Sequence, residues 1–114
     1  MGDDNNGVSV LITFSPRKTK KLRAVFFQDG KYFKSVDFGA SGYEDFLTHK
    51  DERRKQRYLE RHEPREDWSD FMSAGALSRW ILWNKPTLKA SYDDYRRRFG
   101  LHKYGQGVAV EPMN

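Results

Sequence analysis

The sequence predicts an α+β fold in a single domain, with a small three-stranded antiparallel meander followed by three or four helices. Apolar and polar residues alternate over residues 8–14, which is the period of a half-buried strand. Asp29-Gly30 lies between two β-rich runs, and this dipeptide is a strong hairpin signal. From residue 41 onwards, the apolar residues follow helical spacing. The chain has 114 residues, which suffices for one domain and not for two.

The predicted meander occupies residues 8–38. Its first strand, residues 8–14, ends at Ser15-Pro16, because proline has no N–H to donate to a ladder. The side chains of this strand that are expected to face the core are Val8, Val10, Ile12 and Phe14. The second and third strands are expected over residues 22–28 and 31–38, joined by a type I′ turn. Because three strands leave a face open, helices are needed to cover it.

The predicted helical part is residues 41–100. Ser41–Glu44 has the pattern of a capping box, which predicts a short turn of helix that starts there. Thr48–Asp51 has a similar pattern and precedes a strongly charged segment, which predicts a surface helix that ends near His62. Pro64 then breaks this helix.

Two further helices are predicted after a loop. One covers residues 74–83, and its Trp80 and Trp83 are expected in the core because they are the large rings of a polar chain. The other covers residues 88–99 and ends at Gly100, which suits a left-handed cap. Its apolar residues form one stripe: Leu88, Tyr92, Tyr95 and Phe99.

The domain organisation follows from these elements. Residues 1–7 are polar and predict a flexible N-terminal lead, and residues 8–100 form the single α+β domain. Residues 101–114 are polar and contain glycine, which predicts an extended C-terminal tail.

The composition restricts the function classes. Hydrophobic residues make up 37% of the chain, the formal net charge is +5 and there is no cysteine, so disulfides and cysteine-based metal sites are excluded. No apolar run is long enough for a membrane span. No nucleotide-binding loop, nucleophile elbow or zinc-protease motif is present, and the three histidines lack metal-ligand spacing. We therefore expect no enzyme, no metal, no cofactor and no small-molecule substrate.

Two basic sets are the candidate partner-binding residues. The first set lies on the connection between the first two predicted strands and consists of Arg17, Lys18, Lys20, Lys21 and Arg23. Three interpretations of it remain open: contact with phosphates of a nucleic acid, a solvated loop that protects the sheet edge, and contact with an acidic protein surface. The second set is Arg96, Arg97 and Arg98, which suit the negative end of a helix dipole.

A further group of cations lies on the charged helix. It consists of Arg53, Arg54, Lys55, Arg57 and Arg61, interleaved with four carboxylates. Acidic residues three and four positions away pair with such cations along a helix, so a salt-bridged, solvated face is expected here.

Residues 38–101 resemble a family of short basic proteins encoded by nucleocytoplasmic large DNA viruses, including viruses of algae and amoebae. The resemblance rests on five sequence segments: Phe38-Gly-Ala-Ser-Gly-Tyr-Glu-Asp45, His49-Lys-Asp51, Arg57-Tyr-Leu-Glu-Arg-His62, Ala74-Gly-Ala-Leu-Ser-Arg-Trp-Ile-Leu-Trp-Asn-Lys-Pro-Thr-Leu88 and Phe99-Gly100. The family has no assigned activity, so no residue inherits a catalytic role. The resemblance implies a viral protein that is made in the host cytoplasm and packaged into the particle.

Together these observations predict a small non-enzymatic structural protein of the virion. Its expected role is that of a minor capsid component that bridges other viral capsid proteins through its basic patches and extended termini. The alternative is a basic nucleic-acid-binding protein that organises the viral genome or assists viral transcription.

Overall fold

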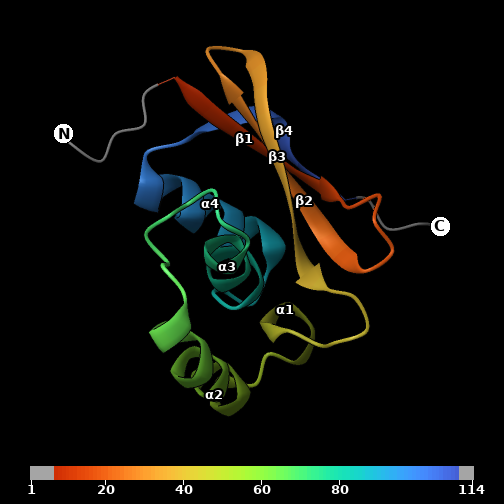
Figure 1. Cartoon of the computed structure of the whole chain (residues 1–114), viewed down its shortest axis with the longest axis vertical. Helices are drawn as coiled ribbons and strands as arrows, with labels where there is room; N and C mark the ends of the chain where they lie inside the picture. The colour runs from red at the N-terminus through yellow and green to blue at the C-terminus, as the bar shows by residue number, and fades with distance from the viewer. Residues whose placement is uncertain (1–6, 111–114) are drawn as a thin grey trace.

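The computed structural model describes residues 7–110 and shows a four-stranded mixed sheet with the strand order β3-β2-β1-β4 (Figure 1). The strands are β1 (Val8–Phe14), β2 (Lys20–Gln28), β3 (Lys31–Ala40) and β4 (His102–Ala109). The first three strands pair antiparallel as a meander, which confirms the predicted β-part in outline. β4 pairs parallel with β1, and the sheet is therefore mixed rather than antiparallel throughout.

The prediction of an extended C-terminal tail is wrong for residues 101–110. Leu101 is buried, and β4 pairs with β1 at both of its ends, with a register shift between Val10 and Ile12. Across β1, the ring of Tyr104 stacks on Phe27 with 3.5 Å between ring centroids. An unpaired edge strand leaves its N–H and C=O groups without ladder partners, and β4 supplies them. The rest of the predicted tail and residues 1–6 of the predicted lead lie outside the described residues.

The turn between β2 and β3 has the predicted conformation. Asp29 and Gly30 have φ of 51° and 83°, and a type I′ turn requires positive φ at both central residues. The register shifts between Phe26 and Phe27, so the hairpin contains a β-bulge near its tip.

Both helices after the sheet begin at an aspartate cap, and the first of them starts later than predicted. α1 (Phe46–His49) begins after Asp45, whose carboxylate accepts a hydrogen bond from the Leu47 amide, so the predicted start at Ser41 is wrong. α2 (Glu52–His62) begins after Asp51, whose carboxylate caps two amides. Aspartate accepts these amide bonds at least as well as serine or threonine, which is why it provides the cap. A 3₁₀ turn, η1 (Glu63–Arg65), follows α2.

The remaining helices occupy the predicted segments. α3 (Ala74–Leu77) continues directly into the π-helical turn η2 (Ser78–Leu82), in which the Trp83 amide bonds to the Ser78 carbonyl. α4 (Leu88–Phe99) ends at Gly100, which has φ of 68°, as the left-handed cap requires.

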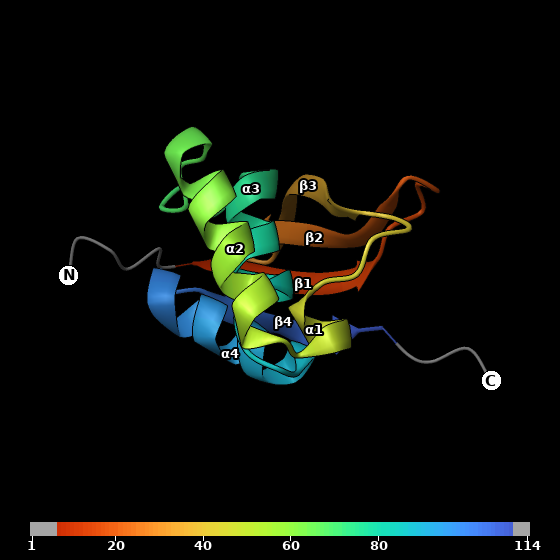
Figure 2. The same cartoon turned by 90° about the horizontal axis from the view of Figure 1, so that it is seen from below.

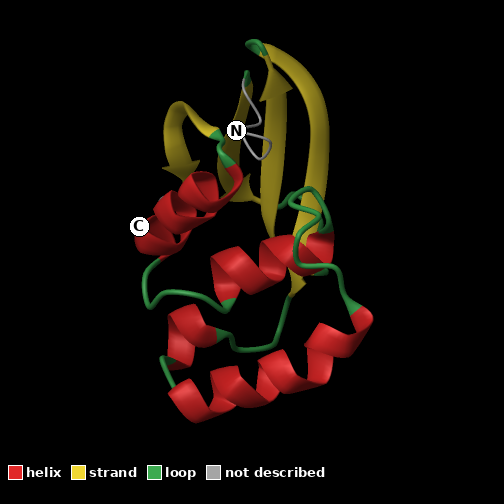
Figure 3. Cartoon of the chain, turned by 90° about the vertical axis from the view of Figure 1, so that its left-hand side faces the viewer, coloured by secondary structure: helices red, strands yellow, loops and turns green. Residues whose placement is uncertain are grey.

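The helices form two layers on one face of the sheet (Figures 2 and 3). α4 and the α3–η2 helix pack against the sheet, whereas α2 lies beyond them as an outer layer (Figure 3). The core between sheet and inner helices consists of Val8, Val10, Ile12, Leu22, Ala24, Phe26, Phe38, Leu77, Ile81, Leu82, Tyr92, Tyr95 and Leu101. Phe14, Trp80 and Trp83 differ from the prediction. Phe14 is 53% exposed, and the two tryptophans are only partly buried and pack against the core cluster.

Candidate anion-binding groove

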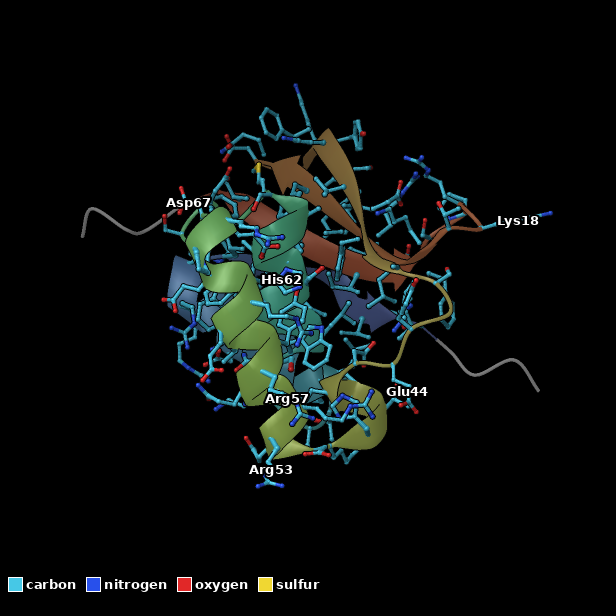
Figure 4. The ribbon with its side chains drawn as sticks, turned by 60° about the horizontal axis from the view of Figure 1, so that its bottom comes forward. Lys18, Glu44, Arg53, Arg57, His62 and Asp67 are labelled. Atoms are coloured by element: carbon cyan, nitrogen blue, oxygen red, sulfur yellow. The ribbon has the colours of Figure 1, made fainter. Side chains whose placement is uncertain are left out.

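A groove of about 660 Å³ separates α2 from the β3–α1 connection and the α3–η2 helix. α2 contributes one rim, and the second rim is formed by the start of β2 with residues 39–45. Figure 4 shows Arg57 and His62 along α2, and Glu44 on the connection that precedes α1. α2 lies in the outer layer, away from the sheet (Figure 3), and its Tyr58 ring contacts Trp83 at the end of η2.

The floor of the groove is a column of stacked rings. Tyr58 lies parallel to Trp83, with 4.1 Å between ring centroids and an interplanar angle of 6°. His62 stacks on Tyr58 at 4.0 Å. Burial raises the pKa of Tyr58, so its hydroxyl stays neutral at physiological pH. These rings join α2 to the end of η2 and form part of the lining of the groove.

Every carboxylate that lines the groove has a partner. The Asp45 carboxylate accepts from Lys21 Nζ at 2.6 Å, and Glu44 lies 3.0 Å from Arg54 Nη1. Glu66 lies 2.8 Å from His62 Nδ1 and accepts a second hydrogen bond from the indole N–H of Trp68. The negative charge on the groove walls is therefore largely compensated within the protein.

Three cations on the same walls have no partner among residues 7–110. Lys20 lines the second rim, and Arg57 and Arg61 lie exposed on α2, four residues apart and thus on one face of the helix. None of the three takes part in an ion pair or a side-chain hydrogen bond within the described part of the chain. Because the three cations line one groove, their charges add up there. This arrangement is suited to binding an anionic group.

The residues of the first predicted partner-binding set, which runs from Arg17 to Arg23, lie in three different places in the structure. Arg17 and Lys18 are exposed on the β1–β2 loop, and Figure 4 shows Lys18 at its tip, far from α2. Lys20 and Lys21 line the groove. Arg23 lies on β2 and makes two hydrogen bonds to Asp37 on the neighbouring strand, at 2.8 Å and 3.0 Å. The five residues therefore do not form one patch.

The Arg23–Asp37 pair makes stability depend on pH. Its hydrogen bonds, with one from the Ser15 hydroxyl, hold the pKa of Asp37 below its usual value of 3.8. The pair therefore stabilises the fold above the unfolded-state pKa, and this contribution disappears as the pH falls through the folded-state pKa. We expect Asp37→Asn to destabilise the protein at about pH 7 and to cost much less at about pH 3. Urea unfolding of both proteins at the two pH values measures this, and a cost independent of pH would contradict it.

The second predicted set lies at the end of α4 and is engaged within the domain. Arg97 and Arg98 lie 3.7 Å and 3.3 Å from Asp94. Arg96 lies 3.4 Å from Asp93, and its guanidinium sits over the Tyr92 ring. The guanidinium of Arg98 also covers the Trp80 ring at 3.8 Å, which shields the half-buried indole from solvent. The loop and the α4 end lie on opposite sides of the molecule (Figure 1).

The prediction that the cations of α2 form ion pairs along their own helix is wrong for most of them. Only Lys55 has a carboxylate of its own helix nearby, Glu52 at 3.9 Å, and Arg54 pairs outside the helix with Glu44. Arg53, Arg57 and Arg61 make no ion pair with described residues. The sequence does contain a signal for the groove: Arg54, Tyr58 and Arg61 recur at helical spacing, so one stripe of α2 carries both charge and a ring.

The described residues hold no cluster of three or more histidine and carboxylate side chains that is suited to a metal ion. Within the same part of the chain, no helix has the length and apolar character that a membrane crossing requires. What the groove offers chemically is positive charge beside aromatic and small side chains, which is the composition of a binding surface.

The structure shows a small single-domain α+β protein with a groove between its outer helix α2 and the β3–α1 connection. A protein-family model described as a family of unknown function (DUF5754) matches residues 10–62. The matched segment runs from within β1 to the end of α2, so it contains Lys20, Arg57 and Arg61 but not Trp83. No curated protein and no solved structure matches the chain.

Proposed function

We propose that this protein is a small non-enzymatic structural protein of a virus particle, a minor capsid component that bridges neighbouring capsid proteins. The observation that carries the proposal is the charge imbalance of the groove, where Lys20, Arg57 and Arg61 are uncompensated while all lining carboxylates are paired. An acidic surface of a neighbouring protein supplies the missing charge. The viral context comes from the resemblance of residues 38–101 described above.

The surroundings of the groove favour a protein partner over a nucleic acid. Glu60 and Glu63 flank Arg61 and make no ion pair with described residues. A phosphate backbone carries one negative charge per nucleotide and is repelled by such carboxylates at regular intervals. A protein partner can place a few acidic side chains against the free cations and avoid the carboxylates.

The proposal is tested on purified particles with a carbodiimide, which joins a lysine amine directly to a carboxylate that it contacts. We expect the chain among the particle proteins, with a cross-link from Lys20 to an acidic residue of a capsid protein. A particle that lacks the chain would overturn the proposal.

The second candidate function is nucleic-acid binding, and the exposed side chains of Arg17 and Lys18 on the β1–β2 loop favour it. Phosphate-driven binding weakens steeply between about 50 and 200 mM salt. A duplex DNA titration over this range separates the two functions: if the protein leaves DNA unbound at the lowest salt, the second candidate is excluded.

A further inference from the structure

A second hollow, of about 650 Å³, adjoins the groove. The two share the wall formed by Lys20, Lys21, Tyr43, Glu44, Asp45 and Leu82. The second hollow is largely apolar, because most of its remaining lining comes from Phe14, Leu22, Leu47, Leu88 and Val110, with Ser41, Gly42 and Thr48 as the rest. A basic compartment and an apolar compartment therefore lie side by side, with the Lys21–Asp45 ion pair between them.

Two aromatic side chains at the second hollow are exposed to an unusual degree. Phe14 is 53% exposed and Tyr43, which lines both hollows, is 74% exposed. Neither belongs to the core cluster. Exposed aromatic side chains gathered around an apolar hollow are typical of a contact surface, since large rings contribute much buried area when a partner covers them.

We infer that the two hollows together hold one segment of a partner protein, with acidic residues in the groove and a bulky apolar side chain in the second hollow. This inference rests on the proposed function and specifies its partner. The acidic part of the segment complements Lys20, Arg57 and Arg61. The apolar side chain covers Phe14 and Tyr43 and packs against the apolar side chains that line the second hollow.

The shared wall is the reason for a single segment rather than two separate ligands. An extended peptide advances about 3.3 Å per residue, so a few residues span the rim between adjoining hollows. An ion pair at that rim, Lys21 with Asp45, is already satisfied and needs no further partner. Anchoring by one buried side chain with charges around it is the common pattern of energetic hot spots in interfaces.

The test uses three labelled peptides of equal length and the full chain. One consists of Glu and Asp with a single Phe, the second has Ser in place of Phe, and the third has Gln and Asn with the Phe retained. Fluorescence anisotropy measures each dissociation constant. We expect the first peptide to bind at least about tenfold more tightly than either of the others.

Substitutions of the two exposed rings test whether the Phe of the peptide binds in the second hollow. Phe14→Ser and Tyr43→Ser are expected to bring the affinity ratio of the two acidic peptides close to one. Phe33→Ser is the matched control, since Phe33 is 58% exposed at the β2–β3 hairpin and lies outside both hollows, so its ratio should equal that of the wild type. Thermal unfolding confirms that each variant is folded.

The outcomes separate this inference from the proposed function. Equal affinities for the two acidic peptides would overturn the apolar anchor and leave the proposed function in place. No affinity for either acidic peptide would overturn both the inference and the groove as a protein-binding site. Tighter binding of an oligonucleotide, lost in Phe14→Ser, would assign the surface to a nucleic acid, and self-association lost in the same variant would assign it to a second copy of the chain.

Discussion

Reversal of two charges on α2, Arg57→Glu with Arg61→Glu, is expected to weaken binding of the acidic Phe peptide at least about a hundredfold, because like charges placed against each other cost several kcal/mol. Both arginines are exposed and unpaired among the described residues, so no internal ion pair is lost. The variant should therefore keep the unfolding temperature of the wild type, and the loss appears only in the dissociation constant.

A matched control carries the same change of net charge at positions outside the groove. Arg53 and Arg65 are exposed and do not line the groove, and Figure 4 shows Arg53 at the beginning of α2. Arg53→Glu with Arg65→Glu is expected to change the affinity by less than about threefold, since exposed charges at a distance are screened by salt. If both double variants weaken binding equally, net charge rather than the groove attracts the peptide.

Tyr92→Ala is expected to cost about 3–5 kcal/mol in the free energy of unfolding, which is the range for removing a large ring from a core. Tyr92 is 2% exposed, and it joins α4 to the sheet because its hydroxyl donates to the Val10 carbonyl. Burial raises the pKa of Tyr92 to about 12, so the hydroxyl remains a donor at neutral pH. Urea unfolding followed by circular dichroism measures the loss.

The comparison with Tyr92→Phe separates packing from hydrogen bonding. The phenylalanine variant keeps the ring and leaves the Val10 carbonyl without this donor, at a cost of about 1–3 kcal/mol. We expect the alanine variant to be clearly less stable than the phenylalanine variant. Equal losses would show that the hydroxyl, and not the ring, holds α4 on the sheet.

The elements that the sequence predicts correctly are those encoded by neighbours along the chain. The β2–β3 turn follows from Asp29-Gly30, whose positive φ values are a local property. The end of α4 follows from Gly100 in the same way, and the alternation over residues 8–14 shows which side of β1 is buried for all but Phe14.

The start of α1 is a case in which local information is ambiguous. Ser41 and Asp45 both have capping side chains, and the sequence does not say which one is used. In the folded protein Asp45 is buried and bonded to Lys21 on β2, so a contact between distant segments selects it. The prediction that the cations of α2 pair along their own helix fails for a related reason, since Arg54 pairs with Glu44 on the β3–α1 connection and Tyr58 stacks on Trp83.

By itself, the sequence determined the meander, the hairpin turn, the approximate helical segments and the excess of positive charge, because each depends on residue type and spacing over a few positions. Only the tertiary structure decided that residues 102–109 join the sheet beside β1, that Tyr58 stacks on Trp83, and which cations stay unpaired. Strand pairing, ring stacking and ion pairing join residues far apart in the chain, and their geometry exists only after the chain has folded.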